Sequence, residues 1–210
     1  MAGPYDFEEQ ERIAAMKAWW EDNARWVYAS IAVVVVAVAG WRGWDYWNRV
    51  QGEEAAAISQ EIAKSRGDAK KTADLSQVLA DKYPGTFYAS EAALIAARAA
   101  FDAGDLEGAR KRLEWVVKNG RAEHKGVARL RLAAVLLDQK KPKEALEVLD
   151  QNADPAFAAL NADLRGDIHF SQGRLDEARA AYKLAIEKSD ARSPTRNLTE
   201  LKLGALGGTP

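Results

Sequence analysis

The sequence predicts an all-α protein in which one membrane-spanning helix near the N-terminus is followed by a solenoid of helical repeats. Three observations lead to this prediction. An uncharged, apolar run extends from Trp26 to Trp41. After residue 53 the chain shows helical periodicity broken by turn residues, without the alternation typical of strands. A short turn-and-alanine motif also returns at intervals of 36 and 33 residues, which indicates a repeat architecture.

Composition and charge narrow the classes of function. Among 210 residues, Lys and Arg total 30 and Asp and Glu total 31, so no strong field attracts the chain to nucleic acid. Hydrophobic residues make up 48%, which is typical of a folded protein rather than a disordered one. The sequence contains no cysteine, which excludes disulfides, thiolate metal sites and a cysteine nucleophile.

The apolar run is predicted to cross a membrane as a helix over residues 25–42. From Trp26 to Trp41 it would rise about 24 Å as a helix, slightly less than the hydrocarbon core of about 30 Å. Arginines that snorkel and tryptophans at headgroup level compensate for the difference. Six of the seven tryptophans lie between residues 19 and 47. The predicted anchor residues are Trp26, Trp41, Arg42, Trp44 and Trp47.

Two alternatives compete with an uncleaved anchor. A buried core helix could be as short as this run, but it would not explain tryptophans at both ends. A cleaved signal peptide fits Ala37-Val38-Ala39 before Gly40, which resembles a small-residue cleavage site. The segment before the run is long and net acidic, however, whereas a signal peptide begins with basic residues. The sequence therefore favours the uncleaved anchor.

The flanks of the run carry a weak signal of orientation. Residues 1–24 are predicted to form a leader with a short amphipathic helix, and residues 43–52 a juxtamembrane helix. Three basic residues precede the run (Arg12, Lys17 and Arg25) and two follow it (Arg42 and Arg49). The positive-inside bias therefore leans only slightly toward a cytoplasmic N-terminus, and charge alone does not fix the orientation.

Residues 53–210 are predicted to form the repeat domain. The segment Gly104-Asp105-Leu106-Glu107-Gly108-Ala109 returns as Gly173-Arg174-Leu175-Asp176-Glu177-Ala178, and Lys140-Lys141-Pro142-Lys143-Glu144-Ala145 lies between them. This spacing is close to the tetratricopeptide period of about 34 residues. We predict repeats at about 90–123, 126–158 and 159–192, after a degenerate helix pair at 53–83 and before a capping helix at 194–206.

The predicted repeats offer a groove for a protein partner. The recurring alanine indicates that the second helix of each repeat approaches its neighbour closely, while the first helices line a concave surface suited to a peptide. From the repeat register, the groove residues are predicted to be Leu94, Arg98, Phe101, Leu130, Ala134, Asp163, Asp167 and Phe170. Some of these are expected to pack between neighbouring repeats instead.

The sequence shows no catalytic or cofactor-binding constellation. His124 and His169 are its only histidines, and neither has the spacing of metal ligands. Neighbouring carboxylates such as Asp176-Glu177 suit the first turn of a helix, where they complement the helix dipole. The sequence therefore predicts a binding protein that is not an enzyme and that uses no cofactor or metal.

Three stretches resemble the YfgM family. They are Gly40-Trp41-Arg42-Gly43-Trp44-Asp45-Tyr46-Trp47-Asn48, Arg129-Leu130-Arg131-Leu132-Ala133 and Ala162-Asp163-Leu164-Arg165-Gly166-Asp167. The resemblance covers essentially the whole chain. It implies an ancillary subunit of the SecYEG translocon in the inner membrane of Gram-negative bacteria, with a cytoplasmic N-terminus and a periplasmic repeat domain. It also implies pairing with a PpiD-type periplasmic chaperone, and no catalytic residues.

The leading functional hypothesis is a membrane-anchored protein-binding scaffold that helps pass translocated proteins to periplasmic chaperones. Its expected partners are the SecYEG translocon, a PpiD-type chaperone and unfolded client proteins. Two alternatives stay open: a general assembly scaffold for another envelope complex, and a membrane-tethered docking module that faces the cytoplasm. The residues alone do not show whether clients bind the groove directly.

Overall fold

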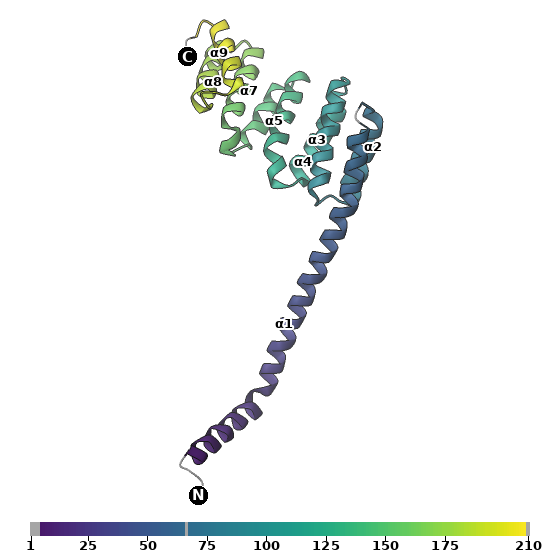
Figure 1. Cartoon of the computed structure of the whole chain (residues 1–210). Coiled ribbons are helices and arrows are strands. Elements are labelled where there is room, and N and C mark those ends of the chain that lie inside the picture. Colours follow the sequence, from purple (N-terminus) through teal and green to yellow (C-terminus); the bar gives the residue numbers. More distant parts are fainter. Residues whose placement is uncertain (1–4, 66, 209–210) are drawn as a thin grey trace. The chain divides into compact units, whose positions relative to one another are not determined.

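A computed structural model describes residues 5–65 and 67–208 of the chain (Figure 1). In this part of the chain the secondary structure is helical throughout, with no strand, which confirms the all-α prediction. The chain divides into two compact units, residues 1–50 and 51–210.

The first helix, α1, extends from Tyr5 to Lys64. No proline lies within it, and its few glycines are isolated among good helix formers, so nothing in the sequence ends the helix earlier. The predicted boundaries after residues 24, 42 and 52 therefore do not coincide with helix ends. The leader, anchor and juxtamembrane segments are parts of one helix, and their limits stay predictions about where it enters and leaves a membrane.

The second unit consists of helix pairs that follow the last turns of α1. Its elements are α2 (Ala69–Lys82), α3 (Phe87–Asp102), α4 (Leu106–Asn119), α5 (Ala122–Asp138), α6 (Pro142–Asp150), the 3-10 turn η1 (Pro155–Phe157), α7 (Ala158–Ser171), α8 (Leu175–Lys188) and α9 (Pro194–Ala205). The first helices α3, α5 and α7 begin one to four residues before the predicted repeat starts.

Side-chain caps explain several of these helix starts. The side chains of Asp68, Thr86 and Asp105 each accept a hydrogen bond from the backbone N–H three residues later. Asp154 and Ser193 each precede a proline, which is the order of an N-cap followed by a proline in the first turn. Asp154 caps η1 through Ala156, whereas the Ser193 side chain makes no capping bond to the backbone.

One left-handed residue recurs between the two helices of each repeat. The angle φ is +78° at Gly104, +61° at Lys140 and +73° at Gly173. Each of these residues precedes its repeat alanine by five positions, so the sequence motif and the structural turn share one register. Glycine adopts this conformation freely, whereas lysine there loses about 1–2 kcal/mol.

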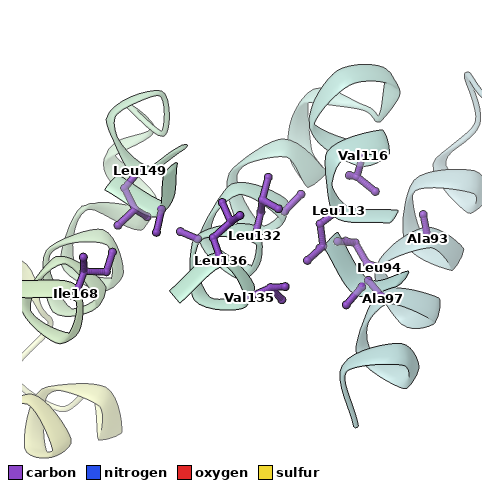
Figure 2. Packing of buried hydrophobic residues seen from close by; sticks show 14 residues of the cluster. Ala93, Leu94, Ala97, Leu113, Val116, Leu132, Val135, Leu136, Leu149 and Ile168 are labelled. Atoms are coloured by element: carbon purple, nitrogen blue, oxygen red, sulfur yellow. The ribbon is translucent and has the colours of Figure 1, made fainter. Parts of the chain in front are cut away.

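The recurring alanines lie buried between packed helices. Ala109, Ala145 and Ala178 are completely buried. In the central core, Leu113, Val116 and Leu149 follow them on the same helix faces and pack against the first helices (Figure 2). A larger residue at any of the three alanines would separate two helices, which is the packing reason for the repeat motif.

The two rows of helices in the second unit pack differently. The first helices contact one another along the row, α3 with α5 and α5 with α7. Among the described helices, the second members α2, α4, α6 and α8 do not contact one another to this extent. In a solenoid of helix pairs the more closely packed row faces the concave side, so we infer that the first helices line the concave surface.

Candidate functional site

The central part of α1 presents apolar side chains that no other part of the described chain covers. Among the described residues, α1 is the one helix long and apolar enough to cross a membrane, and none of its apolar window is buried. Val33, Val34, Val35 and Val36 are each at least 60% exposed. Apolar side chains around the whole circumference are stable in a lipid environment and costly in water.

Polar groups at this segment are arranged as a membrane would require. The hydroxyl of Ser30 donates to the carbonyl of Trp26 at 2.8 Å, so it needs no water partner inside the apolar run. The Arg25 guanidinium lies 5.7 Å from the ring centre of Trp26. The rings of Trp44 and Trp47 lie 5.6 Å apart beyond the other end.

All the predicted anchor residues, Trp26, Trp41, Arg42, Trp44 and Trp47, are exposed on the helix. Tryptophan rings near both ends of an apolar helix suit the two lipid headgroup layers. Their role at a membrane surface stays a prediction.

On the concave surface, a hollow opens between α3 and α5. We call it the α3–α5 pocket; its volume is about 150 Å³. It is lined by Ala97, Arg98, Phe101, Leu113, Arg131, Ala134 and Val135. Two predicted groove residues of the first repeat, Arg98 and Phe101, thus meet Ala134 of the second repeat at one site.

At the rim of this pocket, Arg98 forms an ion pair with Asp102. Its Nε donates to the Asp102 carboxylate at 2.8 Å, and this hydrogen bond raises the pKa of Arg98 above its ordinary value. Both side chains are more than half exposed, so water screens the pair and a competing carboxylate can replace Asp102.

Two other predicted groove residues are less accessible. Leu94 is buried in the central core with 7% of its surface exposed, so its side chain holds the repeats together. Leu130 is partly buried against the same core. The reason is that each first helix also packs against its neighbours, and these two leucines contribute to that packing.

The predicted acidic groove residues of the third repeat hold the C-terminal helix in place. The Nζ of Lys202 on α9 donates to Asp163 and to Asp167, each at 2.8 Å. Thr199 also donates to Asp163 at 2.8 Å, and the Tyr182 hydroxyl donates to Asp167 at 2.9 Å. Both carboxylates are therefore occupied by α9 and α8.

The contacts in this cluster shift the pKa values of Lys202 and Tyr182. Burial alone would lower the pKa of Lys202, but the hydrogen bonds and charges of Asp163 and Asp167 outweigh it, and the pKa lies above 10.5. Burial and the Asp167 carboxylate together raise the pKa of Tyr182. Phe170, at the end of α7, is 53% exposed and keeps an open position.

Sequence reasoning missed Arg131 and Lys202. Arg131 lies three residues before Ala134, one helical turn away on the face toward α3, and that spacing could have identified it. Lys202 gave no such signal, because its pairing with Asp163 spans 39 positions and depends on how α9 folds back.

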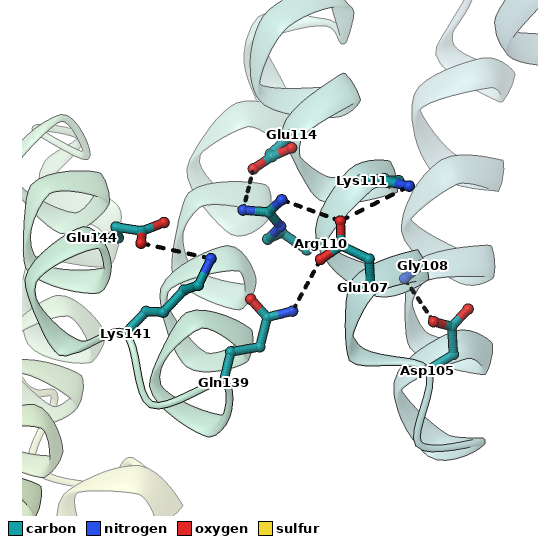
Figure 3. A network of polar contacts seen from close by, with 9 residues as sticks. All are labelled: Asp105, Glu107, Gly108, Arg110, Lys111, Glu114, Gln139, Lys141 and Glu144. Carbon is teal, nitrogen blue, oxygen red and sulfur yellow. Dashed lines mark hydrogen bonds and ion pairs between the residues drawn. The ribbon is translucent and has the colours of Figure 1, made fainter.

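The second helices present a different kind of surface. Arg110 on α4 pairs with Glu107 and Glu114, and Gln139 at the end of α5 donates to Glu107 (Figure 3). Neighbouring charges of opposite sign therefore pair with one another at this part of α4. Among the described residues, no group of His, Cys, Asp and Glu could hold a metal ion.

Comparisons with known proteins agree with this fold. A family model for a tetratricopeptide repeat-like domain matches residues 17–208. Two similar proteins carry the name ancillary SecYEG translocon subunit. The one from Neisseria gonorrhoeae is 34% identical and the match covers 95% of this chain and 97% of that protein. The one from Escherichia coli is 28% identical over 94% and 96%.

A solved structure gives the same picture of the fold. MamA from Desulfovibrio magneticus, from residue 41 to its end, has a TM-score of 0.57 and 23% identity, covering 75% of this chain and 84% of that one. At this identity the likeness concerns the fold alone. Tetratricopeptide-like repeats are binding scaffolds, which confirms the prediction that the chain is not an enzyme.

Proposed function

This chain belongs to the tetratricopeptide repeat-like family that matches residues 17–208, and from that premise we propose that it is an ancillary subunit of the SecYEG translocon. The observation that carries the proposal is the likeness to named ancillary translocon subunits along 95% of the chain. That likeness includes the apolar segment of α1 as well as the repeats, so it concerns the membrane-bound form of the protein and not the repeat fold alone.

In this proposal α1 is an uncleaved anchor in the bacterial inner membrane. The leader faces the cytoplasm, the repeat unit lies in the periplasm, and Trp44 and Trp47 sit beside the translocon at the periplasmic headgroup layer. The slight excess of basic residues before the apolar run supports this orientation. The exposed tryptophans and valines of α1 support insertion into lipid.

The repeat unit then works as a receiving surface for proteins that emerge from the translocon. Its concave side combines an apolar hollow with exposed Arg98, Phe101 and Phe170, and arginine and phenylalanine are enriched at protein–protein interfaces. We propose that this surface contacts a PpiD-type chaperone and unfolded client chains and brings them together after translocation.

Site-specific photocrosslinking in living cells tests the proposal. A photoreactive phenylalanine replaces Trp44 beside the membrane or Phe101 in the groove, both aromatic and exposed. Lys143, exposed on α6, is the control position. We expect Trp44 to reach a translocon subunit, Phe101 to reach a periplasmic chaperone or a client chain, and Lys143 to give neither product.

Crosslinks from Trp44 and Phe101 to another envelope complex, with no translocon subunit among them, would overturn the proposal. That outcome would identify the chain as a general envelope scaffold. The same experiment without translocating clients separates chaperone contacts, which should persist, from client contacts, which should disappear.

A further inference from the structure

The size and lining of the α3–α5 pocket fit one apolar side chain. Ala97, Leu113 and Val135 form its floor and are each at most 3% exposed, so the floor is apolar and packed from behind. A cavity of about 150 Å³ accommodates a benzene ring. Small-molecule and cofactor sites measure about 300–1,000 Å³, so this hollow is too small for such a ligand.

The hollow exists because small residues face each other across it. Ala97 on α3 and Ala134 on α5 stand where a leucine would fill the space between the two helices. Phe101 forms part of the rim and exposes 36% of its surface, so it can pack against a side chain that enters. A residue that enters from solvent would therefore touch apolar atoms on several sides.

The rim of the pocket is positively charged. Arg98 projects from α3 and Arg131 from α5, on the two helices that border the hollow. Asp102 offsets Arg98, but that pair is largely in water. Arg131 is exposed and forms no ion pair with any residue that the structure describes. Guanidinium groups bind carboxylates through two parallel hydrogen bonds, so the rim favours an acidic ligand.

We propose that the α3–α5 pocket binds an extended peptide in which an aromatic or branched apolar side chain lies next to carboxylates. The apolar side chain fills the hollow, and the carboxylates pair with Arg131 and with Arg98. The choice of a protein ligand rests on the proposed function; the side-chain chemistry rests on the pocket alone. Charge complementarity thus selects acidic-aromatic segments among the chains that pass the repeat unit.

Fluorescence anisotropy with the full chain in detergent micelles tests this inference. The probes are short labelled Gly/Ser peptides that carry one phenylalanine between two aspartates. Matched peptides replace both aspartates with lysine, or the phenylalanine with glycine. We expect the acidic-aromatic peptide to bind at least about tenfold more tightly than either, because each loses a charge-assisted contact or a buried ring.

Protein variants locate the binding site. Arg131→Glu should weaken the acidic-aromatic peptide by about tenfold or more, since a favourable charge becomes a repulsive one. Ala134→Leu should remove binding by filling the hollow. Lys183→Glu makes the same change in net charge on an exposed part of α8 and should leave the affinity unchanged. Circular dichroism checks that all three variants are folded.

Equal binding of the acidic and basic peptides would overturn the inference. So would an affinity that changes with neither Arg131→Glu nor Ala134→Leu, or the absence of binding by every peptide. These outcomes leave the Trp44 crosslinks to the translocon untouched, so they do not affect the proposed association with the translocon. Conversely, peptide binding that follows the pattern above without those crosslinks would contradict the proposed function alone.

Discussion

The two units of this chain are built from the same secondary structure but treat apolar side chains in opposite ways. In the apolar segment of α1, Val34 and Val35 are each 60% exposed. In the repeat unit, Leu113 and Leu149 are each 2% exposed between packed helices. Helix content alone therefore does not show whether a helix lies in water or in lipid. The distribution of apolar side chains around the helix axis shows it.

A second contrast concerns the space around the glycine residues. In α1, a Cβ added at Gly40, Gly43 or Gly52 would meet no neighbouring atom. In the repeat unit, a Cβ at Gly166 would lie 2.2 Å from the ring of Tyr182. A small residue such as Gly166 is therefore required by a close contact, whereas the glycines in α1 meet no such requirement within this structure.

Charges placed in the apolar segment should have the largest effect. Each lysine in the double variant Val34→Lys/Val35→Lys would cost about 2.5–3.5 kcal/mol of membrane insertion near the middle of the span. We expect the protein to move from the membrane pellet to the supernatant in alkaline carbonate. Gln60→Lys, at an exposed position of the same helix, is the control and should change nothing. Full membrane retention of the double variant would contradict the anchor.

Close packing in the third repeat should give the next largest effect. Gly166→Ala places a methyl group against the Tyr182 ring, which its hydrogen bond to Asp167 holds in place. We expect a loss of about 1–3 kcal/mol in the free energy of unfolding, measured with urea. Gly204→Ala in α9 meets no atom within 4 Å and should not destabilise the unit. Equal stabilities of the two variants would refute the packing argument.

Loss of Lys202, which joins α9 to α7, should have the third largest effect. Lys202→Met keeps the aliphatic stem but leaves Asp163 and Asp167 without their cation. We expect it to lower the free energy of unfolding by about 1–2 kcal/mol at neutral pH. The control, Lys183→Met on α8, lies at an exposed position and should have no measurable effect.

The pH dependence of this contact follows from the raised pKa of Lys202. Because the folded-state pKa lies above the ordinary 10.5, the contribution is fully present below that pH and is lost as pH rises through the folded value. The stability difference between wild type and Lys202→Met should therefore stay constant from pH 7 to about 9.5 and decrease only in strongly alkaline solution. A difference that disappears near neutral pH would rule out this explanation.

The smallest effect should come from the left-handed turn of the second repeat. Lys140 has a positive φ where the other two repeats have glycine. Lys140→Gly should therefore raise the free energy of unfolding by about 1 kcal/mol, and Gly173→Ala should lower it by a similar amount. Urea titration measures the free energy of unfolding of both variants. Changes of the same sign would show that the turns are not equivalent.

Much of the fold could be predicted because its determinants are local. The apolar run, the turn residues and the repeat alanines each occupy a few consecutive positions, and Ala109, Ala145 and Ala178 lie completely buried in the structure. The continuity of α1 was missed because the changes in composition at its predicted boundaries suggested separate helices. The positions at which a helix enters and leaves a membrane are independent of the positions at which the helix begins and ends.

The groove was harder to predict because it depends on contacts between repeats. The repeat register brought Arg98 and Phe101 to the pocket, but it could not show that Leu94 turns into the core. Nor could it show that Lys202 occupies Asp163 and Asp167, since that contact requires α9 to fold back over α7. The sequence shows which residues share one face of a helix, but it does not show which other helix packs against that face.

We propose that α1 crosses the inner membrane and separates a cytoplasmic leader from a periplasmic repeat unit. The chain has no cysteine, so one engineered cysteine reports one position. Gln10→Cys probes the leader and Asn197→Cys probes α9, both at exposed positions. In spheroplasts treated with a membrane-impermeant maleimide, we expect label on Asn197→Cys, and on Gln10→Cys only after the inner membrane is opened. Label on Gln10→Cys in intact spheroplasts, with Asn197→Cys protected, would contradict this account.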